Sequence, residues 1–227
     1  MQLYIGNKNY SSWSMRPWVL MTQAGIAFEE VRLRFDGFGA GSQFKTAVQR
    51  LSPAGCVPVL VDDGFSVWDT LAITEYLAER EPALALWPKD RRQRARARSV
   101  CAEMHSGFGE LRRHLPMNIE AELPEVGARV LAEHPGVRRD LDRIAQIWGE
   151  LLAQHGGPLL FGDFSAADAY FAPVAMRVRT YGVDLPAAAA AYAQRVAALS
   201  SVHAWCVAAR AEHDFLDFEE PYRSAPP

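Results

Sequence analysis

Apolar and polar positions change period along the chain, and the change divides it into two parts. Over the first 82 residues, short apolar segments alternate with segments whose apolar residues recur every three or four positions. These patterns are typical of strands and of amphipathic helices, respectively. They predict strands at residues 3–5, 29–33, 57–61 and 65–68, and helices at residues 14–24, 43–50 and 70–80. The expected order is βαβ followed by ββα, which indicates an α/β domain.

From Arg91 onward the pattern predicts helices only. Residues 140–154 carry apolar side chains at helical spacing, and the Gly156-Gly157 pair that follows is typical of a helix C-cap. Ser165 with Asp168 three residues later predicts the start of another helix. We therefore expect an α/β domain at residues 1–82, ended by Pro82, a linker at 83–90 and an all-α domain at 91–227.

Composition and charge limit the classes of partner. The 227 residues can form the cores of two modest domains, and a net charge of -3 gives no reason to expect a nucleic-acid partner. Residues 89–98 include six basic side chains. Because aromatic residues are absent from that run, a solvated helical turn is favoured over a nucleic-acid-binding arm.

Membrane and metal partners are not expected either. No segment reaches the ~18 consecutive apolar residues of a membrane span, and the N-terminus lacks the pattern of a signal peptide. Cys56, Cys101 and Cys206 are odd in number and widely spaced, so neither a disulfide framework nor a metal cluster is indicated. These observations predict a protein of the reducing cytoplasm.

The segment from Leu51 to Leu77 carries the clearest chemical signal. Pro58 stands near the start of a predicted strand, where a missing N–H is tolerated. A hairpin turn follows, and Asp69-Thr70 then opens a helix. Such a place can bind a peptide-like molecule through backbone hydrogen bonds and hold its charged end.

This Val-Pro, strand, turn, strand, Asp-Thr-x-Ala-Ile pattern resembles the glutathione-binding half of cytosolic glutathione S-transferases. Residues 161–168 (Phe-Gly-Asp-Phe-Ser-Ala-Ala-Asp) are similar to the capping motif of the core helix in the family's C-terminal domain. The two motifs stand in the family's order, so the resemblance spans nearly the whole chain. It implies a thioredoxin-like N-terminal domain followed by a helical-bundle domain.

The resemblance also implies roles for individual residues. Pro58 would follow a cis peptide bond, and the backbone of Val57 would pair with the cysteinyl part of glutathione. Asp69 and Thr70 would hold the γ-glutamyl group, although the family more often has Glu or Gln followed by Ser. Cys56 stands where family members often carry a lysine or other polar residue that contacts glutathione. If Cys56 takes that place, the glycine carboxylate would be held elsewhere, in the loop region that carries Gln43 and Lys45.

Clustered serines precede and enter the first helix. A purely structural role for them is N-capping, since the helix presents free N–H groups there. The resemblance to serine-type (theta- and zeta-like) transferases implies that one hydroxyl donates to the glutathione sulfur. The family spacing to Arg16 favours Ser12, with Ser11 next and Ser14, Tyr10 and Tyr4 as weaker alternatives. The zeta-like signature Ser-Ser-Cys-x-Trp-Arg is not matched, because this chain has Ser-Ser-Trp-Ser-Met-Arg.

The pocket for the electrophile is expected between the two domains. Trp13, Met104 and Phe108 are its candidate lining residues, although the helical spacing of Met104 and Phe108 is more often that of a core. His105 is expected to be a packed or interfacial side chain. Gly107 and Gly109 fall inside a predicted helical stretch, where they would kink the helix or permit a close approach. The tail at residues 215–222 either covers the cleft or ends the fold.

The resemblance implies a homodimeric transferase that activates glutathione as a thiolate for attack on a small apolar electrophile. A zeta-like alternative is the cis–trans isomerisation of an unsaturated diacid of the maleylacetoacetate type. That reaction would require cations in the electrophile pocket, for which Arg16, Arg112 and Arg177 are candidates. A third alternative is a glutathione-binding or interaction protein without turnover.

Overall fold

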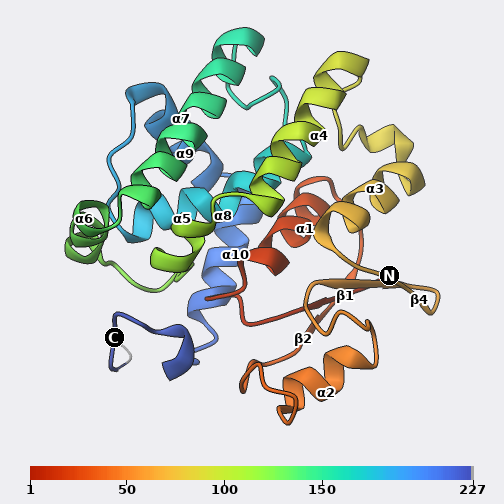
Figure 1. The fold of residues 1–227 in the computed structure, drawn as a ribbon. Helices are drawn as coiled ribbons and strands as arrows, with labels where there is room; N and C mark the ends of the chain where they lie inside the picture. The colour runs from red at the N-terminus through yellow and green to blue at the C-terminus, as the bar shows by residue number, and fades with distance from the viewer. Residues whose placement is uncertain (226–227) are drawn as a thin grey trace.

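The computed structural model describes residues 1–225 and shows a four-stranded sheet domain packed against a helical domain (Figure 1). The predicted fold class is confirmed. Residues 226 and 227, the end of the predicted C-terminal domain, lie outside the described residues.

The N-terminal elements follow the predicted order. They are β1 (Gln2–Ile5), α1 (Ser12–Gln23), β2 (Glu29–Arg32), α2 (Gln43–Gln49), β3 (Val59–Asp62), β4 (Phe65–Val67) and α3 (Thr70–Arg80). The following elements are η1 (Pro82–Leu84), α4 (Arg91–Ser106), α5 (Gly109–His114), α6 (Pro124–Glu133), α7 (Pro135–His155), α8 (Ala166–Thr180), α9 (Ala187–Ala197), α10 (Ser200–Arg210) and η2 (Asp217–Glu219).

The sheet has the strand order β2-β1-β3-β4. β1 is parallel to β2 and antiparallel to β3, with Leu3 opposite both Glu30 and Leu60. Because side chains alternate along a strand, Leu3 joins the main core on one face while Tyr4 packs against a smaller core on the other. Helices α1 and α3 cover the first face, and α2 covers the second with Phe44 and Val48.

The helical domain is built around α8, which packs against α1, α4 and α9 (Figure 1). Its predicted start is confirmed: Asp168 accepts the Ser165 N–H at 2.9 Å and completes a capping box. The same carboxylate accepts hydrogen bonds from the Leu160 N–H and the Tyr192 hydroxyl. Burial nevertheless raises the pKa of Asp168.

Two local expectations are corrected. The first helix begins at Ser12, two residues before its predicted start, so Pro17 lies in its second turn and the helix continues across it. The stretch from Arg91 to Leu115 is two helices, since Gly107 ends α4 and Phe108 takes a left-handed conformation (φ 55°). A Cβ at position 107 would lie 2.7 Å from the Glu103 carbonyl oxygen, so a glycine is needed where the chain turns.

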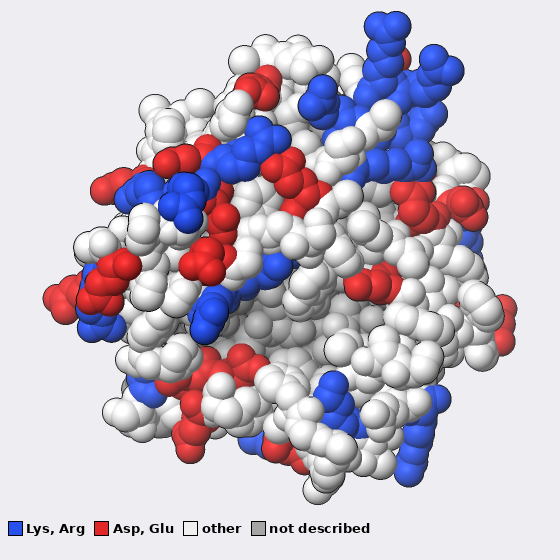
Figure 2. Space-filling view, in the orientation of Figure 1, with Lys and Arg blue, Asp and Glu red and all other residues white. Residues whose placement is uncertain are grey.

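Basic side chains gather at the start of α4 (upper right in Figure 2). Arg91, Arg92 and Arg96 are exposed, and Arg98 pairs with Glu75 of α3 at 2.7 Å. The run is therefore the solvated helical turn that its composition favours. Within residues 1–225, the structure has no helix with the length and apolar character needed to cross a membrane.

Candidate functional site

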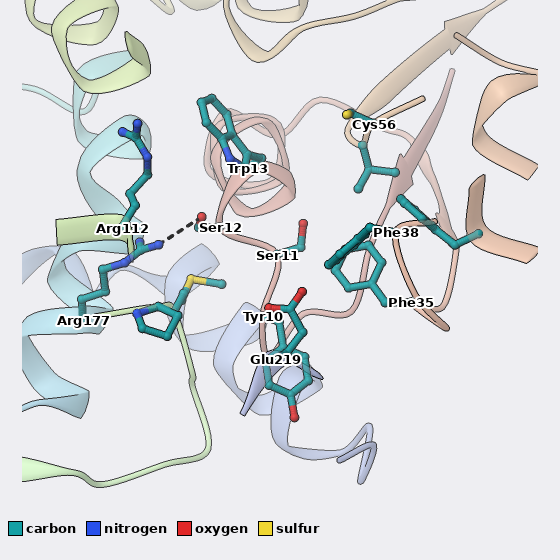
Figure 3. A pocket seen from close by; sticks show the side chains of 14 residues that line it. Tyr10, Ser11, Ser12, Trp13, Phe35, Phe38, Cys56, Arg112, Arg177 and Glu219 are labelled. Atoms are coloured by element: carbon teal, nitrogen blue, oxygen red, sulfur yellow. Dashed lines mark hydrogen bonds between the residues drawn. The ribbon is translucent and has the colours of Figure 1, made fainter. Parts of the chain in front are cut away.

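A cavity of about 340 Å³ lies where the N-terminus of α1 meets the helical domain and the C-terminal tail (Figures 2 and 3). Arginines reach into it from α5 and α8, and aromatic side chains from the segment between β2 and α2 face them. Its lining residues are Tyr10, Ser11, Ser12, Trp13, Phe35, Phe38, Phe44, Cys56, Val57, Arg112, Pro116, Met117, Arg177 and Glu219.

The two serines at the cavity have different hydrogen-bond partners. Ser11 is the N-cap of α1, and its Oγ accepts the Ser14 N–H and donates to the Ser14 Oγ at 2.8 Å. The Ser12 Oγ instead accepts a hydrogen bond from Arg177 Nη2 at 3.3 Å (dashed in Figure 3). Because the partner of Ser12 is a donor, the hydroxyl proton of Ser12 is free to point into the cavity.

Arg112 and Arg177 form the cationic wall of the cavity. Arg177 is 4% exposed and donates to the carbonyls of Leu115 and Pro173 as well as to Ser12. Arg112 donates to the carbonyls of Met104 and Gly107, which become free where α4 ends. The break between α4 and α5 therefore places Arg112 at the cavity.

Arg16 and Arg177 are buried and Arg112 is half-buried, and none of the three forms an ion pair within the described part of the chain. Arg16 does not line the cavity, and its guanidinium lies 4.2 Å from the centre of the Trp13 ring. Burial lowers the pKa of Arg177 to about 9 and that of Arg16 to about 10, and the positive charge of Arg16 lowers the pKa of Arg177 further. Buried cations without a carboxylate partner favour a bound anion.

A second hollow of about 320 Å³ adjoins the cavity across Trp13, Cys56 and Val57, which line both spaces. Its other lining residues are Ala54, Pro58, Trp68 and Asp69. The Val57-Pro58 peptide bond is cis, as the resemblance implies. The two hollows together run from the N-terminus of α3 to that of α1.

Asp69 and Thr70 stand at the start of α3 beside a histidine from the helical domain. Asp69 is the N-cap and accepts the Thr70 N–H, and its second oxygen lies 3.3 Å from His105 Nε2. The Thr70 hydroxyl lies 3.4 Å from His105 Nδ1, and the His105 ring meets Trp13 edge-on. His105 is thus interfacial, as expected. The packing of α4 on α3 brings it into contact with Asp69 and Thr70.

Several predicted residues lie away from both hollows. Met104 and Phe108 are buried in the main core and line neither space. They are therefore core residues, the alternative to a pocket lining that their helical spacing left open. Gln43 is exposed at the start of α2, and Lys45 donates to the Gly55 carbonyl at 2.6 Å. Cys56, by contrast, is exposed and lines both hollows.

The C-terminal tail helps to form another side of the cavity, where Glu219 of the tail lies beside Tyr10. We call these two residues the tail wall. Phe218 packs edge-on against Phe38 at 5.5 Å, and Leu216 joins the smaller core. The Tyr10 hydroxyl donates to Glu220 at 2.7 Å. The tail therefore covers the cleft, and sequence reasoning missed Glu219 because only the fold brings it there.

Comparison with known proteins identifies the relatives of this chain. Residues 10–80 match the family described as "Glutathione S-transferase, N-terminal domain", and residues 91–208 match "Glutathione S-transferase, C-terminal domain". A maleylacetoacetate isomerase of Pseudomonas aeruginosa is 31% identical, over 89% of this chain and 92% of its own length. The rat maleylacetoacetate isomerase is 29% identical, over 81% of this chain and 80% of its own length.

Solved structures show the same fold. A glutathione transferase homologue from Burkholderia with bound glutathione has a TM-score of 0.67 and 25% identity, over 92% of this chain and 97% of its own. A maleyl pyruvate isomerase, a bacterial glutathione S-transferase in the zeta class, has a TM-score of 0.69 and 24% identity, over 92% and 98% of the two chains.

Proposed function

This chain belongs to the glutathione S-transferase family, and we propose that it uses the glutathione thiolate to attack an electrophile that carries a carboxylate. The observation that carries the proposal is the cationic wall: Arg112 and Arg177 line the cavity beside Ser12 without a carboxylate partner. The apolar electrophile expected from the sequence would leave both of these charges unpaired in the cavity.

Glutathione would lie along the two adjoining hollows. The γ-glutamyl group would be held by Asp69 and Thr70, and the cysteinyl backbone by Val57 before the cis proline. The glycine end would then lie toward Cys56 and the α2 side, where Lys45 and Gln43 stand. The thiol would reach the N-terminus of α1.

Ser12 is the proposed contact of the sulfur. Its oxygen already accepts from Arg177, so its proton remains available to a thiolate. The partial positive charge of the helix N-terminus adds to the stabilisation. Holding the two reactants in one cavity contributes more, up to ~7–11 kcal/mol in ideal cases.

For an unsaturated diacid, the arginines would bind the carboxylates and stabilise the negative charge that develops on attack. The sulfur would form a bond to one alkene carbon, and the electron pair of the double bond would move into the adjacent acyl group. The remaining single bond would rotate, and expulsion of the thiolate would restore the double bond in the trans form. Isomerisation is therefore the reaction that this cavity favours.

Simple transfer to an apolar electrophile is the second candidate. Phe38 and Met117 give the cavity an apolar surface that fits such a substrate. Transfer and isomerisation begin with the same thiolate. They differ in the electrophile, because only a carboxylate-bearing substrate needs the cationic wall to bind it.

The experiment compares Arg112→Met with Arg113→Met. Arg113 is exposed on the same helix and lines neither hollow, which makes it the matched control. Loss of one charge-assisted contact should raise the KM for an unsaturated diacid ~10-fold or more in Arg112→Met. The KM for an aryl halide should change less than threefold. Equal effects on both substrates would contradict the carboxylate-binding role.

We further propose a cytoplasmic homodimer, as the resemblance implies. The three cysteines are free, which suits a reducing compartment. A solution mass near twice the 25.2 kDa of the chain would support the dimer.

A further inference from the structure

Forming a thiolate in the cavity releases a proton that needs an acceptor. The hydroxyls of Ser11 and Ser12 can donate to a thiolate, but an alcohol does not hold a second proton near neutral pH. The guanidinium groups of the cationic wall are already protonated. An acceptor other than solvent must therefore come from another side of the cavity.

Glu219 is the one carboxylate among the described residues that line this cavity. It is carried by η2 in the C-terminal tail, and within residues 1–225 its carboxylate has no hydrogen bond or ion pair. Its neighbour Glu220 is fully engaged, since Tyr10, Asn118 and Arg223 all donate to it. The two adjacent carboxylates therefore differ in their freedom to bind a proton.

Burial and the neighbouring Glu220 favour the protonated form of Glu219. Burial raises the pKa of Glu219 to about 7, and the negative charge of Glu220 adds to the shift. Tyr10 lies on the same wall, but burial and its bond to Glu220 raise the pKa of the phenol to about 12, so it stays protonated. Arg112 and Arg177 face the tail wall across the cavity (Figure 3), and Asp217 on the same turn is exposed to solvent.

We propose that Glu219 is the acid–base residue that accepts the thiol proton of glutathione in this cavity. The S–H bond breaks, the sulfur keeps the electron pair as a thiolate, and the proton forms an O–H bond to a Glu219 oxygen. A thiol activated to a pKa of ~6.5–7 and a carboxyl titrating near 7 exchange a proton at little cost in free energy. The proposal rests on glutathione binding in the cavity, as proposed above, and not on the class of electrophile.

Retention of the proton explains how one site holds two acidic groups close together. A thiolate beside an ionised Glu219 would be two like charges in a partly buried place. Protonation of Glu219 leaves a single negative charge that faces Ser12, the start of α1 and the cationic wall. When the electrophile consumes the thiolate, Glu219 returns its proton to solvent, to which it is partly exposed.

Calorimetric titration with glutathione at pH 7.5, in buffers of different ionisation enthalpy, measures binding and proton release together. Wild type should release about 0.2 proton per site, because Glu219 keeps the thiol proton, whereas Glu219→Gln should release about 0.8. Asp217→Asn, on the same turn but exposed, should match wild type. S-methylglutathione has no thiol proton, so it should give equal release in wild type and Glu219→Gln.

A second measurement on wild type alone keeps the test independent of the variants. The ultraviolet thiolate band should show nearly complete ionisation at pH 7.5 while little proton reaches the buffer. Equal release by wild type and Glu219→Gln, or the same difference with S-methylglutathione, would overturn the proposal. So would stoichiometric proton release by wild type. Absence of any glutathione binding would instead remove the proposed function on which the inference rests.

Discussion

The cationic wall and the tail wall hold charge in opposite ways. Arg112 and Arg177 are fixed by main-chain carbonyls and lack a carboxylate partner within residues 1–225. Next to the tail wall, Glu220 is neutralised by Arg223 and two neutral donors, whereas Glu219 on the wall has no partner within residues 1–225. The fixed cations have a permanent charge, whereas the charge of Glu219 changes near neutral pH.

This difference separates two tasks. A permanent, pre-organised cation suits the binding of an anionic substrate, because no reorganisation is needed when charge develops. A carboxyl with a raised pKa suits proton transfer, because both of its protonation states are populated near the working pH. The cavity thus has one side for each task, and Ser12 lies between them.

The largest expected effect comes from removing the buried cation. Arg177→Met should lower kcat/KM for a carboxylate-bearing electrophile ~100-fold, about 2.7 kcal/mol, because both Ser12 and the substrate lose a charged donor. The free energy of unfolding should change by only ~1 kcal/mol, since an unpaired buried charge disappears while two carbonyls lose a partner. Steady-state kinetics and urea unfolding measure the two effects.

Arg179→Met is the control for that variant, because Arg179 is exposed on the same helix. It should leave kcat/KM unchanged within a factor of two. A drop in the unfolding free energy that accounts for the whole loss in Arg177→Met would mean that Arg177 is structural.

A smaller effect distinguishes the two serines. Ser12→Ala should lower kcat ~10-fold, about 1.4 kcal/mol, with little loss of stability, because its hydroxyl contacts the thiolate. Ser11→Ala should instead cost ~1 kcal/mol of unfolding free energy, since Ser11 caps α1. Turnover and thermal unfolding of both variants check this, and a reversed pattern would assign the sulfur contact to Ser11.

The smallest effect is the pH dependence of stability due to Glu219. Its pKa is raised from the ordinary value of 4.5 to about 7, so the folded state binds its proton more tightly than the unfolded state. This contribution stabilises the protein below pH 4.5 and is lost as the pH rises through about 7. Relative to Glu219→Gln, the free energy of unfolding of wild type should fall by ~1 kcal/mol between pH 5 and 8. This is less than the full pKa shift would give, because the carboxyl is partly exposed to solvent.

Urea unfolding of both proteins at pH 5 and pH 8 gives this double difference. Other titrating groups cancel in the comparison because they are common to the two proteins. A double difference near zero would indicate that Glu219 titrates as an ordinary surface carboxyl.

Periodicity predicted the element order well because strands and helices repeat on different local scales. The start of α8 followed from Ser165 and Asp168, which form a capping box within four residues. The break at Gly107 and Phe108 did not follow, since a glycine inside a helical pattern costs only ~1 kcal/mol and is often tolerated. In the folded chain, position 107 lies so close to the Glu103 carbonyl oxygen that a Cβ would not fit, and this closeness is not visible in the sequence.

The candidate site was only partly predictable, because local patterns can be read from the sequence and contacts between distant residues cannot. Ser11, Ser12 and Trp13 are neighbours in the chain, and the cis Val57-Pro58 bond lies in a local motif. Met104 and Phe108 were ambiguous, because helical spacing cannot say whether an apolar side faces a cavity or a core.

The sequence by itself determined the local chemistry: the α/β and helical parts, the serines at the start of a helix, and Asp69-Thr70 at another. Only the tertiary structure decided which distant charges meet these groups. Arg112 reaches the cavity because α4 ends at Gly107, and Glu219 reaches it because the tail folds back over Tyr10. Local patterns are set by a few neighbouring residues, whereas the electrostatics of a cavity depend on side chains that the folded chain brings together from far apart.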